Sequence, residues 1–348
     1  MDNQTLKTLL DQKREASDMP AVGAAVVRPA GIEAIAVSGV RQVDKASAVT
    51  AKDAWHIGSN TKAMTAALYA RLVDQRRAKW NATLESLFPS LRSIMDDAWR
   101  DITIEQLLSH RAGMDDVAGY GQLLSSRNDM RPIAAQRLEL AATKLSKPPP
   151  KTVGEIAYSN FGYIIAGSAI ENIIGKCWED GLRRELFDPL QMHGADFGVP
   201  QGEAPQGHYP TGAGERLRAL GNAAEADNPR ILGPAGTVHL SLPAWAQFVR
   251  VFIDPNQTFL RKESLVHLIA PVSGDPYALG WGVSDDPLSG RLLWHGGSNK
   301  SWLAKVLIVR DYRVAFLVTT NCATPAAQTS TMEIISELKQ VLARPAIH

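Results

Sequence analysis

A serine and a lysine separated by two residues stand early in the chain, in the run Ser59-Asn60-Thr61-Lys62. On a helix, positions i and i+3 lie on one face, one turn apart. If that face is shielded from water, the charged ammonium is disfavoured and the amine can act as a base toward the hydroxyl. The spacing therefore predicts a nucleophilic serine, Ser59, that Lys62 activates for acyl transfer.

The same spacing occurs a second time, in Ser336-Glu337-Leu338-Lys339, so the pair alone is a weak signal. Its surroundings distinguish the two copies. Ser59 stands where a short extended piece, Trp55 to Ile57, should give way to a helix, and a helix start offers free N–H groups and positive potential. Ser336 falls inside a predicted C-terminal helix, where a surface pair is expected. We therefore prefer Ser59.

Two further fragments could assist Ser59. Tyr158-Ser159-Asn160 offers a hydroxyl that can relay protons and an amide that can fix a lysine and a substrate carbonyl. The run His295 to Ser298 contains two glycines after a predicted strand, which let a substrate approach the backbone closely. Taken alone, the first fragment is more typical of a turn before a helix, and the second could be a bulge at a strand end.

Strand patterns occur near both ends of the chain, and helical patterns fill the middle. Two apolar, β-branched runs, Val22 to Val27 and Ile32 to Val40, flank turn residues and predict a hairpin. A helix is expected over 63–77, mostly helical spacing follows from about 81 to 190, and Thr103 with Gln106 forms a capping box. The last expected elements are strands at 291–294, 304–310 and 313–320 and a helix at 326–343.

This order predicts an α+β fold, in which an antiparallel sheet built from both termini is flanked by the terminal helices and joined to a largely helical domain. We expect residues 1–80 and 230–348 to form the sheet domain and 81–229 to form the helical one. Residues 194–236 are rich in Gly, Pro and Ala without a lasting period. The part of this segment in the helical domain, 194–229, is predicted to be a loop region that borders the active site.

The bulk composition excludes several function classes. Net charge is +1 and no long run of like charge occurs, so a nucleic-acid partner is not expected. No window approaches 18 apolar residues, so we expect no membrane span, and the chain as given shows no signal peptide. A cytoplasmic protein and a processed periplasmic or secreted form both remain open, as does the oligomeric state.

The sequence lacks the residues that other classes of hydrolase require. There is no Gly-x-Ser-x-Gly, which an α/β-hydrolase nucleophile requires. The eight histidines are dispersed, and Cys177 and Cys322 lie in no Cys-x-x-Cys or Cys/His cluster, so neither a metal nor another cofactor is expected. Two isolated buried thiols are favoured over a disulfide, although pairing stays open.

At this point the ordered motifs resemble the superfamily of serine β-lactamases and penicillin-binding proteins. Ser-x-x-Lys, Tyr-x-Asn and a [Lys/His]-x-Gly element follow one another, with 99 residues from Ser59 to Tyr158 and 137 from there to His295. Further stretches are similar to the branch that holds class C β-lactamases, D-aminopeptidases, D-alanyl-D-alanine carboxypeptidases and β-lactamase-like esterases. These stretches are Trp55–Lys62, Leu107–Met114, Gly233–Val238 and Gly280–Gly282.

The resemblance implies a role for each matching residue. Ser59 would attack the carbonyl and form an acyl-enzyme, and Lys62 would be the base or tune one. Tyr158 would hold the proton-transfer position between nucleophile and leaving group. Asn160 would orient Lys62 and the substrate.

The resemblance also implies an oxyanion hole made by the backbone N–H groups of Ser59 and Ser298, with His295 and Gly297 lining the strand edge beside the substrate. His295 departs from the lysine that β-lactamases and many carboxypeptidases carry there, and a histidine is largely neutral above about pH 6.5. The Glu-x-x-Leu-Asn element of class A enzymes is also absent from the sequence.

These residues predict a serine hydrolase for a small ester, amide or lactam, with an esterase or amidase preferred because of His295. A class C-like β-lactamase or a D-alanyl-D-alanine carboxypeptidase is the first alternative. An acyltransferase would use the same acyl-enzyme, and a penicillin-binding sensor without turnover would use the same fold. The acyl group itself is not indicated by the sequence.

Overall fold

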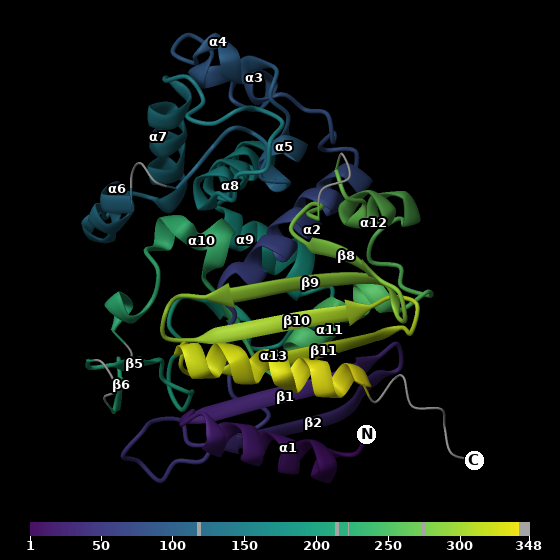
Figure 1. Ribbon diagram of the computed structural model, residues 1–348. Coiled ribbons are helices and arrows are strands. Elements are labelled where there is room, and N and C mark those ends of the chain that lie inside the picture. Colours follow the sequence, from purple (N-terminus) through teal and green to yellow (C-terminus); the bar gives the residue numbers. More distant parts are fainter. Residues whose placement is uncertain (117–119, 213–215, 222, 273–275, 341–348) are drawn as a thin grey trace.

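A six-stranded antiparallel sheet forms the lower half of the molecule in Figure 1, in the order β2-β1-β11-β10-β9-β8. The computed structural model describes residues 1–116, 120–212, 216–221, 223–272 and 276–340. The first two strands come from the start of the chain and the other four from its end, which agrees with the prediction of one sheet built from both termini. The strands are β1 (Ala21–Arg28), β2 (Gly31–Gly39), β8 (Gly282–Asp286), β9 (Gly290–Ser298), β10 (Leu303–Val309) and β11 (Val314–Thr320).

The expected N-terminal hairpin is present, with a register shift between Val26 and Val27. The three C-terminal strands also lie where the sequence predicted them. The edge strand β8 was not foreseen, because its sequence, Gly-Val-Ser-Asp-Asp, has little β-propensity. It forms because a short turn folds it directly against β9.

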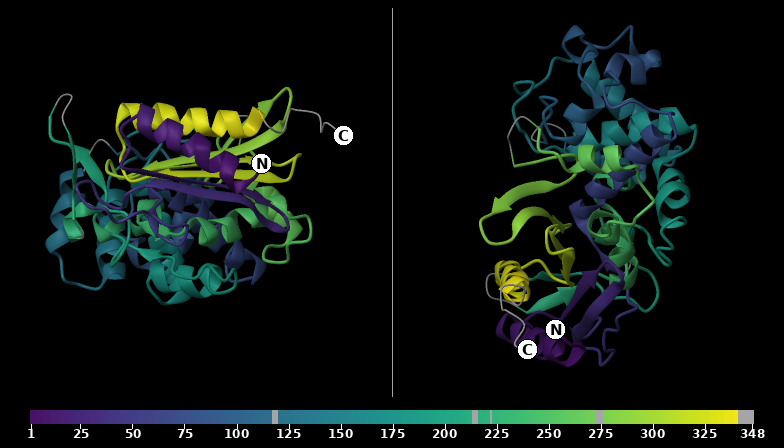
Figure 2. Two further views of the ribbon diagram at one scale, coloured as in Figure 1. Left: turned by 90° about the horizontal axis from the view of Figure 1, so that it is seen from below. Right: turned by 90° about the vertical axis from the view of Figure 1, so that its right-hand side faces the viewer.

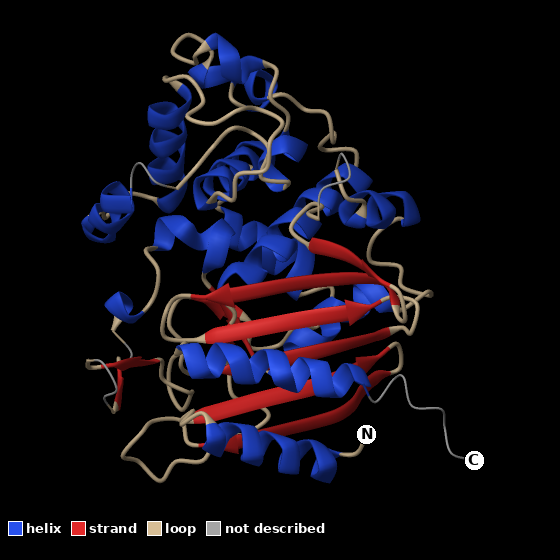
Figure 3. Ribbon diagram, viewed as in Figure 1, coloured by secondary structure: helices blue, strands red, loops and turns tan. Residues whose placement is uncertain are grey.

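Helices cover both faces of the sheet, as Figures 2 and 3 show. The terminal helices α1 (Asn3–Ala16) and α13 (Pro325–Gln340) lie side by side on one face, where Lys13 pairs with Glu333 and Glu337. Helix α11 (Leu242–Ile253) packs on the other face. This arrangement confirms the predicted α+β fold with flanking terminal helices. The expected end of α13 at residue 343 lies outside the described residues.

Side chains of the central strands point alternately to the two faces of the sheet, and each face has its own hydrophobic core. Val22 and Ala24 of β1 belong to the cluster beneath α1 and α13, whereas Ala25 and Val27 belong to the larger cluster on the opposite face. Successive side chains of a strand point to opposite faces, so a strand that is buried on both sides is apolar throughout.

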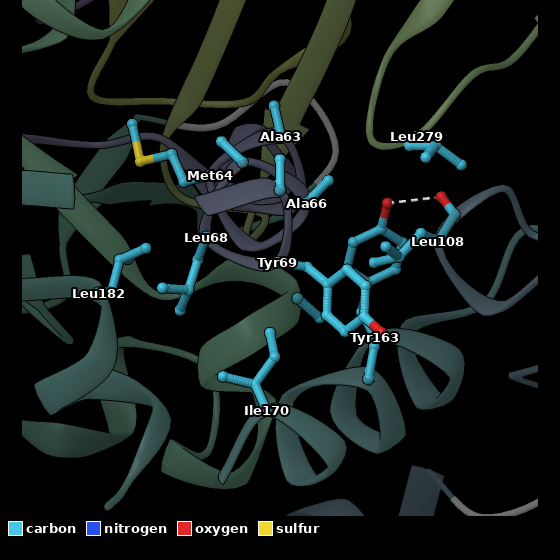
Figure 4. Packing of buried hydrophobic residues seen from close by; sticks show 14 of the residues in the cluster. Ala63, Met64, Ala66, Leu68, Tyr69, Leu108, Tyr163, Ile170, Leu182 and Leu279 are labelled. Atoms are coloured by element: carbon cyan, nitrogen blue, oxygen red, sulfur yellow. Dashed lines mark hydrogen bonds between the residues drawn. The ribbon is translucent and has the colours of Figure 1, made fainter. Parts of the chain in front are cut away.

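Helix α2 (Thr61–Asp74) runs through the middle of the larger core (Figure 4). Eleven of its 14 residues are buried, which is typical of a helix surrounded by protein on all sides. Its flank packs on α8 (Asn160–Ile174), where the Tyr163 hydroxyl donates to the Leu108 carbonyl at 2.7 Å. The helix ends before the predicted Arg77, because Arg76 has a left-handed backbone with φ of 60°.

The remaining elements lie mostly in the helical half of the molecule. The Thr103–Gln106 capping box is present, and the loop-rich segment 194–236 contains short elements. The proposed division at residues 80 and 229 stays a prediction. The elements are β3 (Trp55–His56), η1 (Gly58–Asn60), α3 (Leu84–Leu87), η2 (Pro89–Leu91), α4 (Asp97–Arg100), α5 (Ile104–Leu108), α6 (Tyr120–Ser125), η3 (Ser126–Asn128), α7 (Ile133–Leu145), α9 (Trp178–Leu182), η4 (Arg183–Phe187), β4 (Asp196–Phe197), β5 (His208–Pro210), β6 (Leu217–Ala219), η5 (Ala224–Ala226), η6 (Arg230–Leu232), α10 (Gly233–Gly236), β7 (Val238–Leu240) and α12 (Lys262–Ile269).

Two further sequence predictions concern cysteines and membrane segments. Both cysteines are free, Cys322 buried and Cys177 only partly so. Among the described residues, the helices are too short or too polar to cross a membrane.

Candidate active site

Ser59 lies in the single turn η1 that leads from β3 into α2. The turn depends on Gly58, whose φ of 52° falls in the left-handed region. A Cβ at Gly58 would come within 2.4 Å of the Ser298 backbone nitrogen. The chain therefore needs glycine at this position for two reasons, and the close approach brings the Ser59 turn against the end of β9.

Lys62 is fully buried one turn after Ser59 and its Nζ contacts three oxygen atoms. The distances are 3.1 Å to Ser59 Oγ, 2.7 Å to Asn160 Oδ1 and 2.8 Å to the Ala235 carbonyl. An amide oxygen and a carbonyl can only accept, so two N–H bonds of Lys62 are committed to them. The remaining tetrahedral position of the nitrogen is the one that faces Ser59 Oγ.

Asn160 is held in place by a residue that the sequence analysis missed, Asp116. One Asp116 carboxylate oxygen accepts from the Asn160 side-chain nitrogen at 2.6 Å. The same carboxylate accepts from the backbone N–H of Asn160 at 2.7 and 2.9 Å and from that of Phe161 at 3.2 Å. A carboxylate at a helix N-terminus is favourably placed for these donors. Because Asp116 takes the NH₂ group, the Asn160 oxygen must face Lys62.

Tyr158 lies with its ring facing the Lys62 ammonium, 4.8 Å from Nζ to the ring centroid, and is 47% exposed. The buried ring of His110 packs against it at 4.3 Å, and the Ser159 N–H donates to His110 Nδ1 at 3.1 Å. Burial, with the charge of Lys62, lowers the pKa of His110 well below its usual value. His110 is therefore a neutral support for the Tyr158–Asn160 segment.

His295 lies on β9 with its ring only 6% exposed. Its Nδ1 is 2.8 Å from the Gly296 carbonyl, which can only accept, so Nδ1 carries the proton. Nε2 then accepts from the Tyr277 hydroxyl at 3.1 Å. Burial, with the nearby charge of Lys62, lowers the pKa of His295 to about 3. The third motif therefore presents a neutral imidazole.

Gly297 and Ser298 complete the arrangement at the end of β9. A Cβ at Gly297 would lie 2.6 Å from the Ser59 nitrogen and 2.0 Å from the Ile57 carbonyl, so only glycine fits. These two close approaches place the backbone nitrogens of Ser59 and Ser298 on either side of one contact between η1 and β9. That these two N–H groups form an oxyanion hole stays a prediction.

The second Ser-x-x-Lys copy lacks such surroundings. Ser336 is exposed on α13, and Lys339 pairs with Asp286 at 2.5 Å. The seven predicted site residues, by contrast, gather where η1, α2, α8 and β9 meet. Asp116 could have been noticed only as an acidic residue just after the Leu107–Met114 motif. Among the described residues, no group of three His, Cys, Asp or Glu side chains could hold a metal ion.

Known proteins share the sequence pattern and the fold of this chain. The beta-lactamase family model matches residues 6–337. Penicillin-binding protein 4 of Amycolatopsis lactamdurans is 30% identical over 249 residues, which cover 70% of this chain and 62% of that protein. The chain thus spans less than two thirds of that curated relative.

Two solved structures share the fold across almost the whole chain. The octameric penicillin-binding protein homologue from Pyrococcus abyssi superposes with a TM-score of 0.79 at 19% identity, covering 97% of this chain and 78% of that one. The D-amino acid amidase from Ochrobactrum anthropi SV3 gives a TM-score of 0.77 at 19% identity, covering 98% and 100%. With a family model that extends over nearly all of its length, the chain belongs to the beta-lactamase family.

Proposed function

We propose that this protein is a serine hydrolase that forms an acyl-enzyme on Ser59 and acts on small esters or amides. The observation that carries the proposal is the set of contacts around Lys62 Nζ. Two acceptors fix two of its N–H bonds, so in the neutral amine the lone pair points at Ser59 Oγ, 3.1 Å away. A buried amine with this orientation can act as a general base.

The chemical steps follow from this geometry. Ser59 Oγ bonds to the substrate carbonyl carbon while its proton passes to Lys62, and the carbonyl electron pair moves onto oxygen. The N–H groups of Ser59 and Ser298 stabilise that oxyanion, and each such donor typically contributes about 10²- to 10³-fold in rate. The tetrahedral intermediate then expels the alcohol or amine, which takes the proton back from Lys62, directly or through Tyr158. Water repeats the sequence to release the acid and restore Ser59.

The neutral state of His295 supports esters and amides over β-lactams. A penicillin carries a carboxylate, which a permanent cation on this strand would bind. Here the ring is buried, its Nε2 already accepts from Tyr277, and its pKa lies at about 3. Amides stay in the substrate class because the fold is shared with a D-amino acid amidase.

A substrate panel tests the proposal. Short-chain p-nitrophenyl esters, D-amino-acid p-nitroanilides, D-Ala-D-Ala peptides and nitrocefin are each assayed with the natural protein, Ser59→Ala and, as the matched control, Ser336→Ala. We expect turnover of esters or amides that Ser59→Ala abolishes and Ser336→Ala leaves intact. Nitrocefin turnover above that of every ester and amide would contradict the preference for esters and amides.

Adding hydroxylamine or a primary alcohol to the ester assay distinguishes hydrolysis from acyl transfer. Hydrolysis predicts that the free acid remains the main product. A product that consists mainly of the acceptor's ester or hydroxamate at low acceptor concentration would identify an acyltransferase instead. A stable acyl-enzyme with no product at all would identify a sensor.

A further inference from the structure

A buried carboxylate, Asp227, contacts His56 and Asn299 and has no part in the steps above. It belongs to the segment that follows η5, and it is 5% exposed. Its Oδ1 is 2.7 Å from Nε2 of His56, which is fully buried. The contact is close but not aligned as an ideal hydrogen bond. His56 lies three residues before Ser59.

His56 connects Asp227 to the nucleophile turn. The Gly58 N–H donates to His56 Nδ1 at 3.1 Å. Because Nδ1 accepts, the ring proton of a neutral His56 resides on Nε2, which is the nitrogen that faces Asp227. The carboxylate therefore orients the ring, and the ring in turn holds the backbone N–H of the residue just before Ser59.

Asn299 connects the same carboxylate oxygen to the other half of the hole. Its Oδ1 accepts from the backbone N–H groups of Ser301 and Trp302 at 3.2 and 3.1 Å. The amide nitrogen must then point away from that turn, and it donates to Asp227 Oδ1 at 3.0 Å. Asn299 directly follows Ser298, the source of the second oxyanion donor.

The segment that carries Asp227 is itself anchored from the helical half of the molecule. Arg127, in η3, donates to the Ala224 carbonyl at 3.0 Å and to the Asp227 carbonyl at 2.5 Å. These two bonds hold the backbone of the Asp227 segment against η3.

We propose that Asp227 is a positioning residue that keeps the two halves of the oxyanion hole in register. Its Oδ1 holds the Ser59 turn through His56 and the end of β9 through Asn299, and it does not touch the substrate. This inference rests on the proposed function, because acylation of Ser59 is what gives the hole its purpose. It also predicts that residues 56–60 and 297–302, which are about 240 positions apart in the chain, depend on each other structurally. Asn60 and Ala304 already connect the same two regions through a 3.2 Å hydrogen bond.

The contacts of the two Asp227 carboxylate oxygens decide which variants test the proposal. Asn299 donates to Oδ1 and His56 Nε2 lies 2.7 Å from it, whereas Oδ2 is buried without a hydrogen-bond partner in the part of the chain that is described. A neutral amide oxygen can replace Oδ1, so Asp227→Asn should keep the function. Asp227→Ala removes the acceptor and should not. Glu225→Ala, an exposed change in the same segment, is the matched control.

The kinetic arm uses p-nitrophenyl acetate and an alkylboronic acid, whose tetrahedral adduct on Ser59 places an oxygen in the hole. We expect Asp227→Ala to lower kcat about 10- to 100-fold with little change in KM, and to weaken boronate inhibition by the same factor. Asp227→Asn and Glu225→Ala should stay within about threefold of the natural protein. An unchanged kcat in Asp227→Ala, or an equal loss in Asp227→Asn, would overturn the proposal.

A second arm does not depend on activity. Hydrogen–deuterium exchange should rise in Asp227→Ala in peptides that cover 56–60 and 297–302, and should stay unchanged in Asp227→Asn. Unchanged exchange in both regions would refute the inference even if the enzyme were inactive on every ester. If Asp227→Ala does not fold, Asn299→Ala removes one link only and should raise exchange at 297–302 first. Failure of fluorophosphonate labelling in the natural protein would count against the proposed function alone.

Discussion

Replacing Asp116 by asparagine should reverse the amide of Asn160 and so misdirect Lys62. In the natural protein, one Asp116 oxygen takes the Asn160 NH₂ at 2.6 Å, which leaves the Asn160 oxygen 2.7 Å from Lys62 Nζ. An asparagine at 116 keeps its oxygen where three donors converge, namely the backbone N–H groups of Asn160 and Phe161 and the Ser159 hydroxyl. Its own NH₂ then faces the Asn160 NH₂.

The magnitude follows from the contact that is lost. Two NH₂ groups cannot face each other at 2.6 Å, so Asn160 turns its oxygen toward position 116 and its NH₂ toward Lys62. Lys62 Nζ loses the acceptor to which it donates, and a hydrogen bond that involves a charged group is worth about 1.5–3 kcal/mol. The lone pair of the neutral amine can also turn from Ser59 to the new donor. We expect kcat/KM to fall about 10- to 150-fold.

The assay compares Asp116→Asn with Asp115→Asn. Asp115 is the neighbouring acid, and it lies 3.8 Å from Lys151 rather than at the site. Ester hydrolysis gives kcat/KM, and thermal unfolding checks that each variant folds. Full activity in Asp116→Asn, or an equal loss in Asp115→Asn, would refute the role given to Asp116.

Three other perturbations test the structure around the site. Gly58→Ala should abolish ester hydrolysis and lower the melting temperature. The alanine Cβ would collide with the β9 backbone, and a left-handed φ costs a residue other than glycine about 1–3 kcal/mol. A fully active variant would contradict this prediction. Burial lowers the folded-state pKa of His295 to about 3, so the neutral ring stabilises the fold fully above pH 6.5, and this stabilisation is lost as the pH falls toward 3. In that pH window, His295→Gln should reduce the slope of unfolding free energy against pH by up to about 1.4 kcal/mol per pH unit. Urea titrations at several pH values measure this slope, and an unchanged slope would disprove the prediction. Arg137→Met should cost about 3–5 kcal/mol of unfolding free energy, because it leaves the buried Glu171 without its charged partner. Arg131→Met, at an exposed pair, should change the unfolding free energy little, and equal costs in chemical denaturation would argue against this difference.

Much of the sheet could be predicted because its strands carry strong local signals. The hairpin of β1 and β2 has β-branched runs around a turn, and β10 and β11 are apolar because both of their faces are covered. Strand β8 could not be predicted, since its sequence has one valine among Gly, Ser and Asp and forms a strand only when its partner lies beside it. The end of α2 was misplaced for a related reason: Arg76 leaves the helix through a left-handed conformation that its residue type does not favour.

For the candidate site, too, only the residues with a local sequence pattern could be predicted. The residues at short, fixed spacing, Ser59 and Lys62, could be predicted with a physical reason. Asp116 contacts Asn160, 44 residues away, and Asp227 contacts His56 and Asn299, 171 and 72 residues away, so no local pattern could have identified either acid. Likewise, the sequence indicates that His295 is neutral near pH 7, but its buried position and its bond to Tyr277 depend on the folded neighbours.

The most direct test of the account is covalent labelling with a fluorophosphonate, followed by intact-mass measurement and peptide mapping. One equivalent of label should appear on the peptide that contains Ser59, vanish in Ser59→Ala and stay unchanged in Ser336→Ala. Lys62→Met should slow the labelling rate strongly while the fold is retained. Label that persists in Ser59→Ala, or that maps to Ser336, would contradict the central claim that Ser59 is the nucleophile.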